Sequence, residues 1–262
     1  MRVYFFRFIH FIRHCAVSQT AFNIHSPFVW DFYNQLLRKR FVVTKQALIE
    51  RQREAYLLDK AEITHFDKGA GASTSNQKPL RISSIAKTSL KSPKQATFLY
   101  KLANYYHCRN IIELGTSLGI SSMYLALAST TSSVYSLEAS PEILQKAKSA
   151  AAKCNISNIQ FIEGNFDQTL APLLQNISTF DMAFIDGNHT YEATLRYFHL
   201  MKKHVNNQSM IIFDDIYWSK GMLQAWNEII KDEEISLSFD LYFMGILFFR
   251  KENKKQHFSF RI

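Results

Sequence analysis

Cysteine is scarce in this sequence. The 262 residues include three cysteines, which lie far apart in the chain at Cys15, Cys108 and Cys154. An odd number of widely separated cysteines does not form a disulfide framework, and their spacing does not suit a zinc site. We therefore expect a protein of the reducing cytoplasm, without structural disulfides or zinc.

The sequence also lacks a long uninterrupted apolar run. The aromatic and basic stretch at residues 1–14 is broken by Arg7 and His10, and no clean cleavage site of small residues follows it. A signal peptide or a membrane-spanning helix is therefore not expected. On a helix, the apolar side chains of this stretch share one side and the basic ones fall on the other. Two alternatives remain: the helix packs on the body of the protein, or it lies on an anionic membrane surface.

Acidic residues are fewer than basic ones, which gives a formal net charge of +9 and an isoelectric point near 9.4. Such a charge suits an acidic partner such as nucleic acid, phospholipid or a phosphorylated substrate. Charge spread over a surface more often serves solubility, however. The sequence contains no Asn-Pro-Pro-Tyr-type motif of base-flipping enzymes and no aromatic-basic array. A nucleic-acid partner is therefore not indicated.

The dinucleotide fingerprint Gly-x-Gly-x-x-Gly is absent as well. Starting at Gly115 it would need glycine at positions 117 and 120, where the sequence has Ser117 and Ile120. This difference argues against an NAD-binding site. The segment from Asn110 to Ser122 nevertheless predicts a buried strand, a tight turn with Gly115 and Gly119, and a helix. The N-terminus of such a helix offers free N–H groups to an anionic ligand.

Two further predicted strands end in groups that suit a nucleotide-like ligand. The second strand ends in Glu138, about 20 residues after the glycine turn, where a nucleotide-binding α/β fold places the carboxylate that binds the ribose hydroxyls. The third strand, residues 159–163, is followed by a turn from Gly164 to Asp167. The ends of the first two strands thus point to one ligand.

Carboxylates and a histidine follow the next two predicted strands. The fourth strand ends in Asp186, with His189 three residues later, and the fifth ends in Asp214 and Asp215. Because parallel strands put their carboxyl ends side by side, we expect these aspartates to converge. Gathered carboxylates need a cation, and oxygen ligands suit Mg²⁺, Mn²⁺ or Ca²⁺. A histidine beside them suits the role of a general base.

The glycine turn, in the form Gly-Thr-Ser-x-Gly-x-Ser, resembles motif I of the class I S-adenosylmethionine (SAM) methyltransferases of the catechol and macrocin O-methyltransferase-like families. The segment IDGNHTYE, residues 185–192, looks like the macrocin branch. The chain also resembles a group of bacterial class I methyltransferases that carry HSPF near the start, DDIYWSK after the fifth strand and FMGxxFFRK at the end. The core resemblance covers about residues 91 to 250.

The resemblance implies an α/β fold with a Rossmann-like, doubly wound sheet of seven strands, the last of them antiparallel. It implies an N-terminal helical extension or cap over residues 1–90, with a flexible loop at 67–80, and a SAM-binding methyltransferase domain over residues 91–262. Gly245 is expected to mark a bend or bulge between the last two strands. The basic residues from Arg250 onward are expected to form a solvated tail.

The resemblance also assigns roles to residues. The catechol family holds Mg²⁺ through an aspartate after the fourth strand and an Asp-Asn pair after the fifth, which match Asp186, Asp214 and Asp215, with Asp215 in place of asparagine. His189 stands where that family has its catalytic lysine. Contacts to SAM are expected from Glu113, Gly115, Thr116, Ser117, Gly119, Ser121, Glu138, Ala139, Asn165, Phe166 and Asp186.

These observations predict a SAM-dependent methyltransferase that acts on a hydroxyl group of a small molecule, with or without an assisting Mg²⁺ ion. His189 and Asp186 are the predicted catalytic residues. Two other classes stay as alternatives: a noncatalytic SAM-binding or membrane-associated scaffold, and a nucleic-acid methyltransferase. An assay of methyl transfer to cell extract distinguishes the first alternative from an enzyme, because a scaffold would bind SAM but transfer no methyl group.

Overall fold

The computed structural model describes residues 2–20, 24–39, 43, 45–65 and 78–261. The chain divides into two compact units. The central unit is Arg40–Ser178, and the terminal unit combines Met1–Lys39 with Thr179–Ile262. These compact units have other bounds than the predicted N-terminal extension, residues 1–90, and SAM-binding domain, residues 91–262, and that division stays a prediction.

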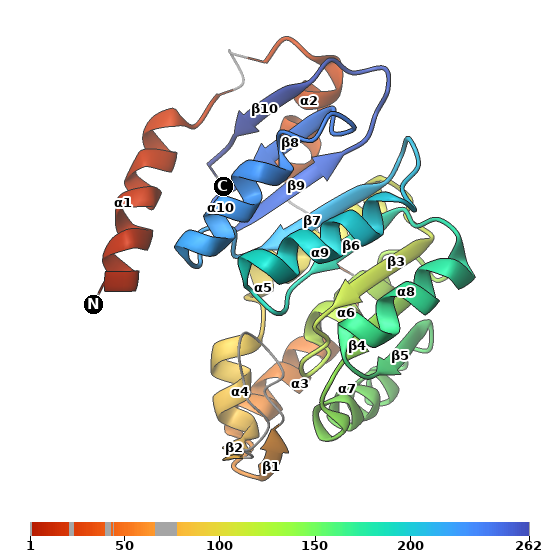
Figure 1. The fold of residues 1–262 in the computed structure, drawn as a ribbon. Coiled ribbons are helices and arrows are strands. Elements are labelled where there is room, and N and C mark those ends of the chain that lie inside the picture. The colour runs from red at the N-terminus through yellow and green to blue at the C-terminus, as the bar shows by residue number, and fades with distance from the viewer. Residues whose placement is uncertain (1, 21–23, 40–42, 44, 66–77, 262) are drawn as a thin grey trace. The chain divides into compact units, whose positions relative to one another are not determined.

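The core of the central unit is a parallel βαβαβ arrangement (Figure 1). Its strands pair in the order β3-β4-β5, and they are linked by helices α6 and α7. Apolar side chains of the first strand, among them Ile111 and Ile112, are fully buried, because a parallel strand is covered on both faces. The bounds are β3 (Asn110–Leu114), α6 (Ile120–Leu127), β4 (Ser133–Glu138), α7 (Pro141–Lys153) and β5 (Ile159–Glu163).

Helices and a small hairpin complete the central unit. Ser92 and Gln95 form a capping box that starts the helix before the first core strand. Residues 67–77 of the predicted loop at 67–80 lie outside the described residues, whereas residues 78–80 belong to a strand that pairs antiparallel in a hairpin. The bounds are α3 (Gln46–Leu58), β1 (Glu62–His65), β2 (Lys78–Arg81), α4 (Ile82–Ser89), α5 (Pro93–Tyr105) and α8 (Phe166–Ile177).

The terminal unit holds five strands in its described residues, in the order β6-β7-β9-β8-β10. Strand β9 is antiparallel to both of its neighbours, as predicted for the last strand. The bounds are β6 (Met182–Ile185), α9 (Tyr191–Lys202), β7 (Met210–Asp214), α10 (Lys220–Ile229), β8 (Leu237–Asp240), β9 (Met244–Phe248) and β10 (Gln256–Ser259).

Strand β10 corrects the predicted total of seven strands and lies within the predicted solvated tail, of which Lys251, Lys254, Lys255 and Arg261 are exposed as expected. It pairs parallel with β8. Phe258 and Phe260 are 5% and 0% exposed, and their rings lie 5.9 and 5.7 Å from the ring of Phe239. Two phenylalanines near the end of the chain therefore bury enough apolar surface to add a strand, although basic residues surround them in the sequence.

Helix α1 (Arg2–Val17) packs on the terminal unit. Its His14 is 3% exposed, with Nδ1 3.2 Å from Oδ1 of Asp240 and Nε2 3.1 Å from the carbonyl oxygen of Phe260. Tyr242 donates a hydrogen bond from its hydroxyl to the carbonyl oxygen of Arg7 at 2.7 Å. The helix therefore rests on the body of the protein through its basic side. The next helices are α2 (Pro27–Phe32) and the π-helix η2 (Tyr33–Arg38).

None of the helices in the described part of the chain combines the length and the hydrophobicity that crossing a bilayer requires.

Gly245 is not a bend between strands, which corrects the prediction. It lies inside β9, paired with Phe213 of β7 and Asp240 of β8. A Cβ atom at this position would lie 2.5 Å from ring atoms of Trp226, a residue that is 2% exposed. The glycine is therefore needed because an indole ring packs directly on the strand backbone.

Replacing Gly245 with alanine should lower the free energy of unfolding by about 1–3 kcal/mol, because the added methyl group overpacks the contact with Trp226. Gly221→Ala is the matched control, since a Cβ there would have its nearest neighbour at an ordinary 3.5 Å, in a helix that favours alanine. Urea denaturation followed by circular dichroism measures both. Equal midpoints for the two variants would contradict this account of Gly245.

Candidate functional site

The turn between β3 and α6 has an unusual backbone. Gly115, Ser117 and Gly119 all have positive φ angles, of 102°, 47° and 80°. The N–H groups of Gly115 and Thr116 donate to the carbonyl oxygen of Leu137 in the next strand, at 3.0 and 3.1 Å. The turn is therefore tied to the end of β4, and glycine meets its need for left-handed conformations.

Gly119 also brings two helices close together. It is the N-cap residue of α6, and a Cβ atom there would lie 2.9 Å from the Cβ of Ala147 in α7. Only a residue without a side chain allows this approach in this conformation. The second glycine of the predicted motif is thus explained by helix packing.

Glu113 lies beneath the turn and is fully buried. Its Oε2 accepts hydrogen bonds from the hydroxyls of Ser122 and Ser136, and Ser136 is 2.6 Å from the hydroxyl oxygen of Thr116. A carboxylate with no exposed surface cannot contact a ligand that binds from solvent. The structure therefore places Glu113 as a support that joins β3, β4 and α6, whereas we predicted a direct contact with SAM.

Glu138, at the end of β4, bridges two segments of the central unit. Its Oε2 accepts a hydrogen bond from the N–H of Ser117 at 3.0 Å, and its Oε1 accepts one from the N–H of Ser140 at 3.0 Å. The predicted proximity of Glu138 to the glycine turn is confirmed. Each carboxylate oxygen retains a lone pair, so Glu138 can still accept hydrogen bonds from a vicinal diol.

The exit of β5 joins the same network. Gly164, with a φ angle of 137°, donates its N–H to the carbonyl oxygen of Glu138 at 2.9 Å. Asn165 caps α8 by accepting a hydrogen bond from the N–H of Asp167 at 3.0 Å. The ends of the three strands are therefore hydrogen-bonded to one another.

The predicted SAM contacts of the central unit fall into two groups by exposure. One group is buried and shapes the site: Glu113, Thr116, Gly119 and Ser121. The other is partly exposed and can meet a ligand: Gly115, Ser117, Glu138, Ala139, Asn165 and Phe166.

In the terminal unit, Asp186 and His189 form a pair beyond the end of β6. Asp186 Oδ1 lies 3.6 Å from His189 Nε2, and the two side chains are 11% and 25% exposed. The hydroxyl of Thr190, at the N-cap of α9, accepts the N–H of Ala193 at 3.3 Å. The alternative in which His189 merely caps the helix is therefore excluded.

The three predicted metal ligands do not form a metal site. Asp214 is 1% exposed at the end of β7, whereas Asp215 is partly exposed and has a φ angle of 52°, with its N–H bonded to the carbonyl oxygen of Phe243. No group of three histidine, cysteine or acidic side chains that could hold a metal occurs among the described residues. The prediction of Mg²⁺ held by Asp186, Asp214 and Asp215 is thus not supported, because adjacent strand ends do not fix the directions of their side chains.

Trp218, which lies near His189, is contacted by an arginine from the start of the chain, Arg7. The guanidinium of Arg7 lies 3.6 Å from the ring centroid of Trp218, and its Nε donates to the carbonyl oxygen of Trp218 at 3.2 Å. The ring of Trp218 is in turn 6.3 Å from that of His189. No local sequence pattern links residues 211 positions apart, so only the fold reveals this contact.

A buried ionic network holds α1 beside these residues. Tyr217 donates its hydroxyl to Oδ2 of Asp240 at 2.6 Å. Burial lowers the pKa of His14, but the hydrogen bond and charge of Asp240 outweigh it, so that the pKa is raised overall. Burial raises the pKa of Asp240, but His14 and Tyr217 outweigh it, and the pKa is lowered overall. Both shifts favour the charged pair.

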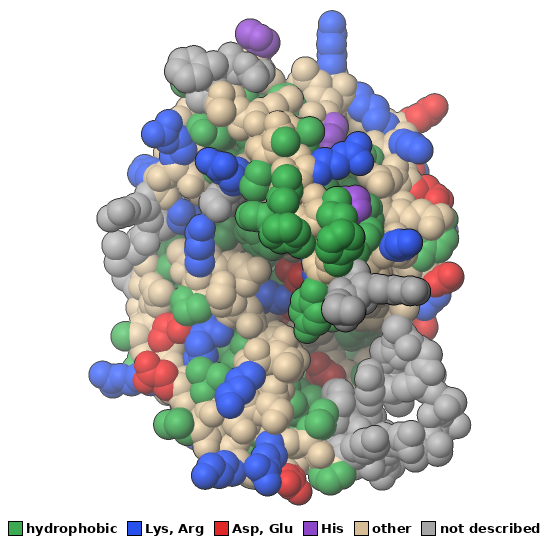
Figure 2. All heavy atoms as spheres, turned by 90° about the vertical axis from the view of Figure 1, so that its left-hand side faces the viewer, with side chains coloured by type: hydrophobic (Ala, Val, Ile, Leu, Met, Phe, Trp, Pro, Cys, Tyr) green, Lys and Arg blue, Asp and Glu red, His purple; other side chains and the backbone are tan. Residues whose placement is uncertain are grey.

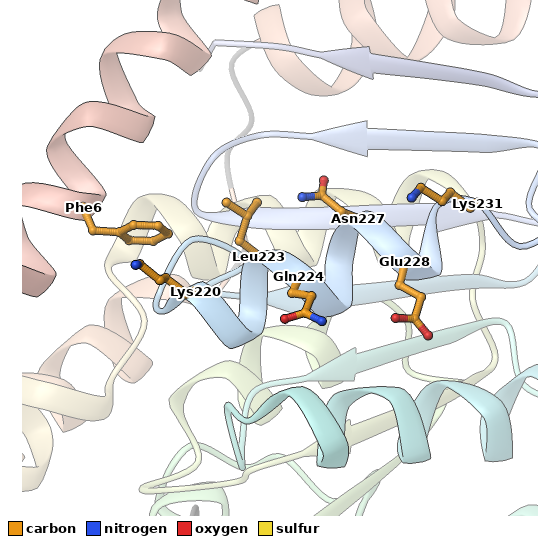
Figure 3. Close-up of a pocket in the computed structure, with 7 residues that line it drawn as sticks. All are labelled: Phe6, Lys220, Leu223, Gln224, Asn227, Glu228 and Lys231. Atoms are coloured by element: carbon orange, nitrogen blue, oxygen red, sulfur yellow. The ribbon is translucent and has the colours of Figure 1, made fainter.

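The surface hollow shown in Figure 3, of about 460 Å³, lies along α10 and contains none of the predicted site residues. It is lined by Phe6, Lys220, Leu223, Gln224, Asn227, Glu228 and Lys231.

Part of the chain is similar in sequence to known proteins. Residues 112–216 match the sequence profile of a family described as a methyltransferase domain. An uncharacterized protein of Acanthamoeba polyphaga mimivirus is 35% identical over 95 residues, which are 34% of this chain and 43% of the relative. The chain thus aligns with less than half of the length of this relative.

Solved structures of methyltransferases share the fold. An O-methyltransferase from Bacillus cereus in complex with S-adenosylhomocysteine (SAH) has a TM-score of 0.56 and 20% identity, covering 84% of this chain and 97% of its own. A SAH-bound methyltransferase from Podospora anserina has a TM-score of 0.63 and 15% identity, covering 89% and 99%. This chain therefore has the same fold as these methyltransferase structures. The segment at 112–216 that matches the methyltransferase-domain profile includes the glycine turn, Glu138 and the Asp186–His189 pair.

Glu138→Gln should weaken the binding of SAH about tenfold or more. Each carboxylate oxygen of Glu138 accepts a hydrogen bond from a backbone N–H group, and in the variant the amide NH₂, itself a donor, would face one of these donors. Glu163→Gln is the matched control, since Glu163 is the register partner of Glu138 on β5 and is exposed. Titration calorimetry compares the two. Equal affinities would show that Glu138 does not take part in cofactor binding.

Proposed function

We propose that this protein transfers a methyl group from SAM to a hydroxyl group of a small molecule. The observation that carries the proposal is the hydrogen-bonded set of strand ends in the central unit, in which Glu138 joins the glycine turn to the start of α7. The methyltransferase match over residues 112–216 and the shared fold of SAH-bound structures support it.

The central unit would bind SAM. The positive φ angles at Gly115 and Ser117 keep the turn tight, so a ligand can come close to its backbone. Glu138 would accept hydrogen bonds from the two ribose hydroxyls, and Asn165 and Phe166 would border the adenine. Glu113, buried under the turn, would hold this arrangement rigid through its bonds to Ser122 and Ser136.

The terminal unit would act on the acceptor. Methyl transfer breaks the bond between sulfur and the methyl carbon and forms a bond between that carbon and the acceptor oxygen, whose proton must leave. His189 would take this proton, and Asp186 would orient the imidazole and stabilise its protonated form. The ring of Trp218, near His189 and 45% exposed, could border the acceptor.

We derive no step through a metal ion, because the described aspartates do not gather into a three-ligand site. In this proposal the proton acceptor is therefore the side chain of His189.

His189→Ala should reduce turnover about 10²-fold or more while the affinity for SAH stays nearly unchanged, because the lost group acts on the acceptor and not on the cofactor. His199→Ala is the matched control, since His199 is an exposed histidine on the adjacent α9. The assay is transfer of a radiolabelled methyl group from SAM to fractionated cell extract, with SAH calorimetry in parallel.

Undiminished turnover of the His189→Ala variant would refute the assignment of the base. SAH binding without transfer to any fraction by the unaltered protein would instead favour the noncatalytic scaffold.

A further inference from the structure

Helix α1 exposes its apolar side. Phe5 and Phe8 are 65% and 61% exposed, although phenylalanine is usually buried. They belong to a contiguous set that we call the α1 apolar face: Tyr4, Phe5, Phe8, Ile9, Phe11 and Ile12. On a helix, this set covers an arc of about 160°. Figure 2 shows hydrophobic side chains gathered on this side of the molecule.

The opposite side of α1 fixes how the helix is rotated. His14 is buried in its pair with Asp240, Arg7 stacks on Trp218, and the ring of His10 lies 5.5 Å from that of Tyr217. These polar contacts hold the basic side inward. The helix is therefore inverted relative to an ordinary surface helix, whose apolar stripe faces the core.

The charge around the α1 apolar face selects its partner. Helix α1 contains no acidic residue, and the first one in the chain is Asp31. Residues 1–39 contain five basic residues and that single acidic one. Arg13 is exposed at one edge of the face. Figure 2 shows Lys and Arg side chains around the hydrophobic group.

Aromatic side chains on one face, with arginine at its edge and no acidic residue, suit a helix that lies flat in the headgroup region of an anionic bilayer. A second copy of the chain fits less well, because a two-fold contact between identical faces would bring the same arginines together. We propose that the α1 apolar face binds the surface of an anionic membrane.

The test uses the intact protein and vesicles of phosphatidylcholine with and without phosphatidylglycerol, in a sedimentation assay. The protein should bind the vesicles that contain phosphatidylglycerol, and added salt should weaken the binding. The double variant Phe5→Glu, Phe8→Glu should reduce binding about tenfold or more, because it removes apolar contact and adds negative charge. Leu58→Glu is the matched control, since Leu58 is an apolar residue of α3 that is 79% exposed.

A second variant, Arg13→Glu, tests the charge alone and leaves the apolar side chains intact. It should also weaken binding to phosphatidylglycerol vesicles. Thermal unfolding of each variant checks that the chain still folds, and unchanged SAH affinity keeps this test independent of the proposed methyl transfer.

Failure of the unaltered protein to bind either kind of vesicle would overturn the proposal. So would equal binding by the double variant and the Leu58→Glu control. A dimer in analytical ultracentrifugation that the double variant abolishes, without vesicle binding, would show that a second copy covers this face.

Discussion

The proposed site depends on two hydrogen bonds that the carboxylate of Glu138 accepts from backbone N–H groups. One N–H comes from Ser117 in the turn after β3, and the other from Ser140 at the start of α7. The carbonyl oxygen of the same residue accepts the N–H of Gly164 after β5. One residue at the end of the middle strand therefore holds the exits of all three strands together.

The buried polar groups under the turn serve the same end. Glu113 and Ser136 have no exposed surface, and a buried carboxylate is tolerated because hydroxyl groups hydrogen-bond to it. The turn thus rests on a connected set of hydrogen bonds, which fixes its backbone before any ligand arrives. Such preorganisation lowers the cost of binding.

The terminal unit uses charge in a different way. The buried pair of His14 and Asp240 anchors α1, and the pKa values of both groups shift in the direction that keeps them charged. Arg7 contributes a second anchor on Trp218. Because these anchors occupy the basic side of the helix, its aromatic side is left at the surface.

Much of the fold was predictable from local signals. The parallel strands appear as short apolar runs, and Glu138, Asp186 and Asp214 follow or end them at the positions that the sequence indicated. The bonds of Glu138 to the glycine turn follow from the parallel order of β3 and β4, which the sequence pattern implies.

Other features depend on contacts between distant residues. Gly245 looks like a bend until Trp226 is seen to pack on it, and the strand at 256–259 is hidden among basic residues. Periodicity predicted two faces of α1, but the inward face is set by Asp240 and Trp218, which lie more than 200 residues away. Asp215 likewise adopts a left-handed backbone conformation, with a φ angle of 52°, that no motif encodes.

The most direct test of the account is a crystal structure of the protein with SAH. The ribose hydroxyls should lie within hydrogen-bonding distance of the Glu138 carboxylate, and the ligand should pass close to the backbone of Gly115. SAH bound elsewhere, or bound with its ribose away from Glu138, would contradict it.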